Sequence, residues 1–229
     1  MRRRYVAGVA AMGAAAAYIL LARRRQLTWG ATAEETEALL PSDDLIGDPD
    51  LTATRAITVR ITPDGVWPWI AQLGQGRGGF YSYDSLENLL GCDIHSADGI
   101  VAGWQEVAVG DEVNLFPDGP LDVAAVEPGR SLVIRGGVPM GKVAPPYDFT
   151  WAFVLCEQLG GTTRLLVRER YAYTKWWAPL LVEPAAMTSF VMSRKMLRGI
   201  RDRAERTVVL PEERPTSRRG GDQPIWVSA

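Results

Sequence analysis

The stretch GQGRGGFYSYD, from Gly74 to Asp84, decides between two fold classes. Its first half matches G-x-G-x-x-G, the glycine pattern of dinucleotide-binding turns. Such a turn requires a strand before it and a helix after it, inside a parallel βαβ unit. In this chain, however, apolar residues at helical spacing from Val66 to Leu73 predict a helix directly before the glycines. We therefore expect the stretch to connect two helices rather than to bind a nucleotide phosphate, with the glycines allowing positive φ and close backbone approach.

The segments around this connector predict mostly strands. Residues 56–61 alternate apolar and polar side chains, which indicates a half-buried strand, and Thr62-Pro63-Asp64 then begins the first helix. The second helix is expected at residues 82–90. Downstream, short apolar segments separated by proline and glycine turns predict five more strands, at residues 112–116, 121–126, 131–135, 149–157 and 163–173. Short turns between consecutive strands favour an antiparallel sheet.

A long amphipathic helix is predicted to close the domain, from about Pro184 to Arg206. Pro179 and Pro184 should mark the transition into it, because proline is tolerated only near the start of a helix. The order is therefore one strand, two helices, a run of antiparallel strands and one long helix. We predict an α+β fold in which the final helix covers the inner face of a curved sheet.

Sequence motifs along the domain carry a resemblance to a known superfamily. They are VWPWIAQLGQ (66–75), GRGGFYSYD (76–84), LENL (86–89), GCDIH (91–95) and TWAFVL (150–155). With the order of elements, they resemble the SRPBCC superfamily, the START- and Bet v 1-like helix-grip proteins that include polyketide cyclase/dehydrase-like members. More narrowly, the chain is similar to a bacterial, largely actinobacterial, group that carries the GRGGFYSYD block behind an N-terminal hydrophobic segment. The resemblance covers residues 51–208 and implies a cavity between sheet and long helix that takes lipids or other apolar molecules.

The N-terminus predicts a membrane segment. Three arginines at 2–4 precede an uncharged run from Tyr5 to Ala22, and three more follow at 23–25. The run has about 18 residues, roughly 27 Å as a helix, which is just enough to cross a hydrocarbon core. We expect a single-pass anchor in the cell membrane, with its orientation open because the arginines balance across it. A cleaved signal peptide and a helix lying on the membrane surface are the alternatives.

The chain divides into four parts on this interpretation. Residues 1–25 form the transmembrane anchor, and the acidic residues 26–51 form a linker with a short helix capped by Thr32 and Glu35. Residues 52–208 form the helix-grip domain. Residues 209–229 are rich in proline, arginine and glycine, which is typical of a disordered tail.

The composition of the chain limits the classes of partner and cofactor that we expect it to bind. The formal net charge of -2 gives no general basic field, so nucleic acid is not expected as a partner. The chain has a single histidine, His95, and two cysteines, Cys92 and Cys156, without the spacing of a zinc site. We therefore expect no metal and no cofactor. The cysteines are interpreted as unpaired thiols, with a disulfide between them left open.

A cluster of polar and aromatic residues after the glycines is the first candidate site. It consists of Arg77, Tyr81, Tyr83, Asp84, Glu87 and His95. Tyr83 and Glu87 are four residues apart and so share a helix face. The cluster either ties the two helices to the rim of the sheet or lies at the cavity mouth and orients the polar end of a ligand. His95, whose unperturbed pKa is near neutral, could in principle serve as a general base.

Glu169 is the second candidate. In the strand at 163–173 it shares one side with Tyr171 and other apolar residues, whereas the arginines at 164, 168 and 170 occupy the other side. If the apolar side lines the cavity, Glu169 points inward and must be paired or protonated, since an unpaired buried carboxylate is costly. A bulge that turns Glu169 to solvent is the alternative. Trp151 and Tyr171 complete the expected ligand-binding residues, because aromatic side chains supply apolar walls.

Three functions are compatible with these residues, and no catalytic residue is assigned. We expect a membrane-anchored module that binds a lipid, a polyketide or another hydrophobic small molecule. The alternatives are a polyketide cyclase/dehydratase-like enzyme that uses the same cavity, and an interaction domain with a collapsed cavity. The enzyme requires at least two of Glu169, His95, Tyr81 and Tyr83 to converge on one pocket.

Overall fold

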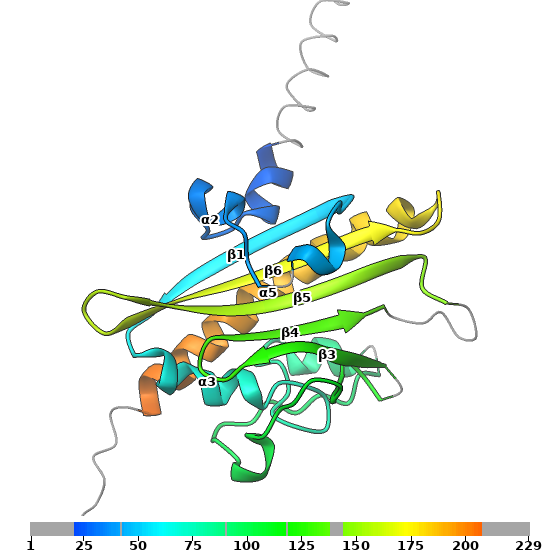
Figure 1. The fold of residues 1–229 in the computed structure, drawn as a ribbon. Helices are drawn as coiled ribbons and strands as arrows, with labels where there is room; N and C mark the ends of the chain where they lie inside the picture. Colours follow the sequence, from blue (N-terminus) through cyan, green and yellow to red (C-terminus); the bar gives the residue numbers. More distant parts are fainter. Residues whose placement is uncertain (1–20, 42, 90, 118, 138–143, 208–229) are drawn as a thin grey trace, which may run out of the picture.

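The computed structural model describes residues 21–41, 43–89, 91–117, 119–137 and 144–207. Within these ranges, six antiparallel strands form one sheet in the order β1-β6-β5-β4-β3-β2. The strands are β1 (Leu51–Val59), β2 (Glu112–Asn114), β3 (Pro120–Glu127), β4 (Ser131–Gly136), β5 (Tyr147–Gln158) and β6 (Thr162–Tyr173). The long helix α5 (Ala178–Thr207) crosses the inner face of the curved sheet, as Figure 1 shows. The predicted α+β fold is therefore confirmed, and the arrangement is that of a helix grip.

The helix α5 begins earlier than the sequence predicts. It starts at Ala178, and Pro184 lies inside it rather than at its beginning. A proline inside a helix removes the hydrogen bond to the carbonyl four residues before, which here is that of Leu180. Leu180 is 76% exposed, so water can replace the lost donor. Packing of Ala178, Val182 and Ala186 into the core then holds this first part of the helix in place.

The glycine stretch is a connector between two helices, as predicted. It joins α3 (Pro63–Ala71) to α4 (Asp84–Leu89). Gly74, Gly76 and Gly79 have φ angles of 127°, 73° and 69°, a region that other residues rarely adopt. A side chain at Gly79 would also lie 3.0 Å from the backbone of the segment that follows α4. The glycines therefore shape the path of the chain.

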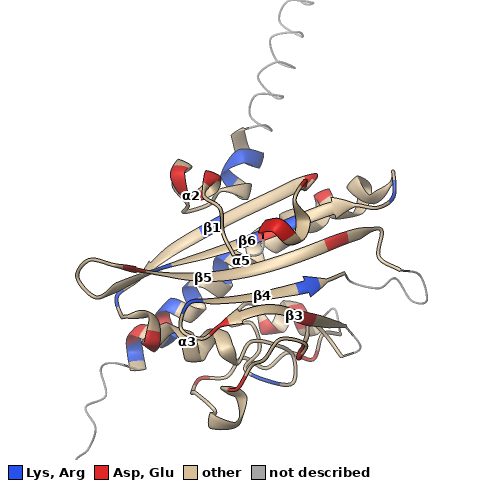
Figure 2. Ribbon diagram, in the orientation of Figure 1, with Lys and Arg blue, Asp and Glu red and all other residues tan. Residues whose placement is uncertain are grey.

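The segment before β1 differs from the expected linker because it packs on the outer face of the sheet. Its helix α2 (Ala33–Glu37) has the predicted capping box of Thr32 and Glu35, and the 3-10 helix η1 (Asp43–Ile46) follows. Figure 2 shows the acidic residues of α2 and η1 beside the sheet. There Arg168 of β6, only 3% exposed, pairs with Asp43 at 2.5 Å.

The segment before β1 also covers apolar side chains on the outer face of the sheet. Leu166 interrupts the row of β6 arginines and forms a small outer core with Ala56 and Val154. Ala31 and Leu40 from the segment before β1 pack against it. The described residues of the segment 26–50 therefore belong to the folded body, since removing them would expose buried arginines and apolar side chains together.

The membrane and tail predictions fall mainly on residues that the structure leaves undescribed. In the described part of the chain, no helix combines the length and the apolar character that crossing a bilayer requires. The expected span at residues 5–22 lies outside that part except for Leu21 and Ala22, which begin a helical stretch at 21–27. The expected disordered tail at 209–229 lies wholly outside it.

Candidate functional site

Two neighbouring cavities lie between the inner face of the sheet and α5 in the described structure. We name them the Glu87 cavity and the Glu169 cavity, after the carboxyl group that lines each one. Each has a volume of about 240 Å³, and Leu115, Trp151 and Ser189 line both. The other lining residues are Phe80, Ser82, Glu87, Cys92, Phe116, Met192, Ser193 and Met196 in the first, and Tyr147, Phe149, Glu169, Tyr171 and Ala185 in the second. Together the cavities reach the size of small-ligand pockets, roughly 300–1,000 Å³.

Trp151 of β5 forms the wall that the two cavities share. Its ring packs against those of Phe80, Phe149 and Phe153, with centroids 5.8, 6.5 and 4.8 Å away. Its indole Nε1 is buried and has no hydrogen-bond partner among the described residues. An indole N–H can only donate, so an acceptor on a bound molecule would satisfy it. The prediction that Trp151 supplies an apolar wall is consistent with this position.

Glu169 points inward, as the alternation of β6 predicts. It is 2% exposed and forms an ion pair with Arg55 of β1 at 2.6 Å. The hydroxyl of Ser189 donates to both of its oxygens at 2.7 and 2.8 Å. Ser193 donates at 3.1 Å, and the hydroxyl of Tyr171 lies 3.4 Å away. The expected pairing of a buried carboxylate is therefore present, and the alternative of a bulge toward solvent is wrong.

Arg55 is the main site residue that the sequence analysis missed. Its side chain is fully buried, and its Nε donates to the carbonyl of Gln26 at 3.2 Å. The predicted strand began at Ala56, which left Arg55 outside it. With β1 beginning at Leu51, Arg55 has the same parity as Ala53 and Val59, both in the core. The available signal was an arginine on the apolar side of one strand together with a glutamate on the apolar side of another, which the structure places on neighbouring strands.

Ser189 and Ser193 were also missed. They are four residues apart on α5 and therefore lie on one helix face. Small polar residues within the apolar stripe of a helix, flanked here by Ala186 and Met196, indicate a polar partner across the interface. That partner is the Arg55–Glu169 pair on the sheet.

Of the polar and aromatic cluster predicted after the glycines, Glu87 is the member that lines one of the two inner cavities. Its Oε2 is buried and accepts no hydrogen bond from the described residues. Burial, reinforced by the nearby charge of Asp84, raises the pKa of Glu87 to about 7. Cys92 lines the same cavity, and burial followed by the charge of Glu87 raises the pKa of its thiol. Cys92 and Cys156 are both unpaired thiols.

Other members of the predicted cluster hold the connector in place. Asp84 accepts hydrogen bonds from the amide and the hydroxyl of Ser96, at 2.7 and 2.6 Å. Arg77 donates to two backbone carbonyls, those of Ala71 at 3.0 Å and Trp104 at 2.7 Å. Arg77 and Asp84 thus tie the two helices to neighbouring loops, which was the alternative to a ligand-binding role.

The tyrosines of the cluster lie apart from the cavities. Tyr81 is 1% exposed, and its hydroxyl accepts a hydrogen bond from Gln72 at 2.9 Å. Burial raises the pKa of Tyr81 to about 12. Tyr83 is 42% exposed, and Lys195 lies 5.8 Å above its ring. Neither side chain lines the Glu87 cavity or the Glu169 cavity.

His95 points to solvent. Its side chain is 81% exposed, and its Nε2 lies 3.2 Å from Oδ1 of Asp93. Of Glu169, His95, Tyr81 and Tyr83, only Glu169 lines one of the two cavities. The convergence required for acid–base catalysis by these residues is therefore not present.

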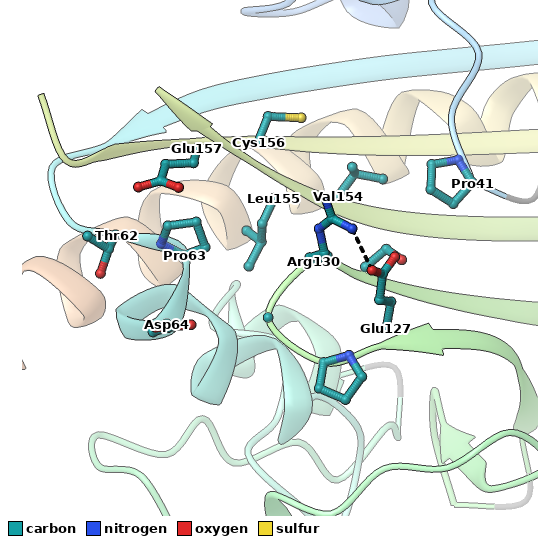
Figure 3. A pocket seen from close by; sticks show the side chains of 13 residues that line it. Pro41, Thr62, Pro63, Asp64, Glu127, Arg130, Val154, Leu155, Cys156 and Glu157 are labelled. Carbon is teal, nitrogen blue, oxygen red and sulfur yellow. Dashed lines mark hydrogen bonds and ion pairs between the residues drawn. The ribbon is translucent and has the colours of Figure 1, made fainter. Parts of the chain in front are cut away.

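A larger hollow, of about 790 Å³, lies where the β3–β4 turn meets the start of α3 (Figure 3). Glu127 and Arg130 line it and form an exposed ion pair at 2.7 Å. Figure 3 shows Glu157 on the opposite side of the hollow from Glu127. Some buried polar side-chain atoms have no hydrogen-bond partner among the described residues, and none of these atoms belongs to a residue that lines this hollow. The two inner cavities, which are lined by Glu87 and Trp151 with such atoms, are therefore the stronger site. The described residues also contain no group of three or more His, Cys, Asp or Glu that could hold a metal ion.

Comparison with known proteins leaves the family of this chain unassigned. No family model matches the chain, and no curated protein matches it. The resemblance to the helix-grip superfamily therefore rests on the sequence motifs and on the architecture of the structure itself.

Solved structures offer only distant likenesses. Protein MLL2253 from Mesorhizobium loti is 18% identical over 69% of this chain and 98% of its own, with a TM-score of 0.42. Hypothetical protein jhp0584 from Helicobacter pylori is 12% identical over 72% of this chain and 95% of its own, with a TM-score of 0.46. DynU16, a protein in the dynemicin biosynthetic locus, is 18% identical over 66% of this chain and 47% of its own, with a TM-score of 0.38. Likenesses this distant carry no argument about what this protein does.

Proposed function

We propose that this protein binds an apolar small molecule or lipid in the paired cavities between the sheet and α5. The observation that carries the proposal is Trp151, which lines both cavities and whose buried Nε1 has no hydrogen-bond partner among the described residues. Leaving such a donor unsatisfied costs about 1–3 kcal/mol. A bound molecule with an acceptor group would remove that cost, and its apolar body would fill the aromatic walls.

Binding is favoured over acid–base catalysis of the cyclase/dehydratase type. The oxygens of Glu169 already accept from Arg55, Ser189 and Ser193, so a substrate proton would have to displace these donors. Such a fully satisfied carboxylate is suited to holding the sheet and α5 together.

The two cysteines provide the test, because only Cys92 lines one of the two inner cavities. Cys92 lines the Glu87 cavity, whereas Cys156 is exposed on β5 and lines the separate hollow beside the start of α3. A bound molecule should slow alkylation of Cys92 and leave Cys156 as an internal control. Native mass spectrometry of the full chain, followed by lipid extraction, would identify a co-purified ligand. Equal alkylation rates with and without added apolar compounds, and no extractable ligand, would refute the proposal.

We also propose that residues 5–22 tether this domain to the cell membrane. The apolar run flanked by arginines supports it, as does the ion pair of Arg23 with Glu183 of α5 at 2.6 Å. Exposed Trp176 and Leu180 lie at the same end of α5 and suit contact with lipid. Labelling of Cys156 by a membrane-impermeant maleimide, in intact and in permeabilised cells, would report which side the domain occupies. Recovery of the full chain in the soluble fraction without membranes would contradict the tether.

A further inference from the structure

Glu87 lies in the cavity without any described positive group to pair with. Its backbone is held by hydrogen bonds, from its own amide to the carbonyl of Tyr83 at 3.0 Å and from the amide of Cys92 to its carbonyl at 3.1 Å. The side chain is therefore presented to the cavity by a fixed turn of α4. Its Oε2 is buried and lacks a hydrogen bond within the described structure.

The groups that face Glu87 make its charge more costly. Asp84, on the same helix, adds a second negative charge, and burial followed by the charge of Glu87 raises the pKa of the Cys92 thiol. The α5 residues across the cavity are Ser189, Met192, Ser193 and Met196, none of which is ionisable. The remaining lining residues carry no charge either: Trp151 on β5, Ser82, and the apolar Phe80, Leu115 and Phe116. A carboxyl group in such surroundings is stable when it is protonated. Its ionised form is stable only when it meets a hydrogen-bond donor.

We propose that the Glu87 cavity receives a hydrogen-bond-donating end group, a hydroxyl or a protonated amine, on an otherwise apolar molecule, and that Glu87 excludes molecules ending in a carboxylate. This inference rests on the proposed function, because it names the class of ligand for the same site. A carboxylate end would meet Glu87, with the charge of Asp84 close by, at one end of the paired cavities and Glu169 at the other. A hydroxyl can donate to Glu87 and also accept from Trp151 Nε1, whereas a protonated amine can only donate.

The experiment compares four probes with the same ten-carbon chain: decane, 1-decanol, decylamine and decanoate. The full chain, held in amphipol, is alkylated with each probe, and protection of Cys92 relative to Cys156 is measured by mass spectrometry. We expect decanol and decylamine to give half-protection at concentrations about tenfold or more below decanoate, as a charge-assisted hydrogen bond implies. Decanoate protecting as well as decanol would overturn the inference. Protection by none of the four probes, decane included, would instead refute the proposed function itself.

Variants separate the two end groups. Glu87→Gln keeps an acceptor but removes the charge. Protection of Cys92 by decylamine should therefore weaken to that by decanoate, while protection by decanol changes little. Trp151→Phe should weaken the protection of Cys92 by decanol more than the protection by decylamine. Asp93→Asn is the matched control, because Asp93 lies on the same segment with a side chain that is 68% exposed, outside both cavities. Each variant is referenced to its own alkylation rate without a probe, and an unchanged probe series in Glu87→Gln would contradict the inference.

The wild-type protein provides a measurement that does not depend on folding of the variants. The pKa of Glu87 is raised to about 7, so the carboxyl group ionises between pH 6 and 8. An alkylamine stays protonated over that range, since its pKa resembles that of lysine, about 10.4. Protection by decylamine should therefore strengthen several-fold from pH 6 to pH 8, and protection by decanol should stay level. Equal pH profiles for the two probes would refute a role for the charge of Glu87.

Discussion

The ion pair between Arg55 and Glu169 links three parts of the molecule at the scale of single residues. Arg55 is fully buried on β1, Glu169 is 2% exposed on β6, and the serines of α5 donate to the carboxylate. Arg55 also reaches the carbonyl of Gln26 in the segment before β1. A buried pair of this kind stabilises less than its charges suggest, because both were removed from water, but breaking it leaves one charge uncompensated.

Replacing one partner should therefore be worse than replacing both. Glu169→Gln should lower the free energy of unfolding by about 3–5 kcal/mol, because Arg55 stays buried without its counter-charge. The double variant Arg55→Met with Glu169→Leu should recover much of that loss. Arg130→Ala, which breaks an exposed ion pair, should change the free energy of unfolding by less than about 1 kcal/mol. Denaturant unfolding of the full chain measures all three, and a double variant as unstable as the single one would contradict the account.

The buried carboxyl group of Glu87 should make stability depend on pH. Its pKa is raised from 4.5 to about 7 in the folded chain, so its contribution is fully present below about 4.5 and is lost as pH rises through about 7. Glu87→Gln cannot ionise and should melt higher than the wild type at pH 8 but not at pH 4.5. Asp93→Asn provides the control for removal of one acidic charge. Thermal unfolding from pH 4.5 to 8 tests this, and parallel curves for wild type and Glu87→Gln would refute it.

At the scale of elements, α5 crosses the glycine connector at Gly199. A Cβ atom at Gly199 would overlap the carbonyl oxygen of Tyr81, a backbone atom that cannot move aside cheaply. Helix propensity favours alanine over glycine by about 1 kcal/mol, but overpacking costs about 1–3 kcal/mol. We expect Gly199→Ala to be destabilising overall, as measured by denaturant unfolding. Gly103→Ala, where a Cβ atom meets nothing within 4 Å, should be nearly neutral.

The cover of the outer face depends on Asp43. This residue pairs with Arg168 at 2.5 Å and with Arg170 at 2.8 Å. Asp43→Asn should lower the free energy of unfolding by about 3 kcal/mol, because Arg168 is almost fully buried and would lose its counter-charge. It should also speed hydrogen exchange in residues 33–46, measured by mass spectrometry. Asp44→Asn, an exposed neighbour in the same 3-10 helix, is the matched control, and equal exchange in the two variants would contradict this role.

At the scale of the whole molecule, the sheet and α5 enclose a cavity whose size should set the length of the ligand. Leu115 lines both cavities, so Leu115→Ala should merge them into a larger space. The alcohol that best protects Cys92 should then be longer by a few carbons, at a cost in stability of about 1–3 kcal/mol. Leu180→Ala, on the exposed face of α5, should leave the preferred length unchanged. An unshifted preference in Leu115→Ala would show that the cavity does not select length.

Much of the fold follows from local patterns, and part of the site follows with it. The alternation of β6 places Glu169 on the inner side, and the glycines after α3 mark a connector. The cluster after the glycines is different, because its members point to separate places. Glu87 lines a cavity, Tyr81 is in the core, and His95 is in solvent. Neighbours in sequence within a loop have no fixed side-chain direction, since loop backbones lack the periodicity of helices and strands.

The sequence by itself determined the α+β class, the antiparallel run of consecutive strands and the inward direction of Glu169, because these depend on hydrophobic period and turn residues. Only the tertiary structure decided that Arg55 pairs with Glu169, which is 114 residues away. It also decided that the acidic segment before β1 covers the outer face. It further decided that Glu87 and Trp151 each keep a buried polar atom that has no partner in the described part of the chain. The reason is physical: pairing and burial depend on which surfaces meet after folding, and that information lies in no single segment of the chain.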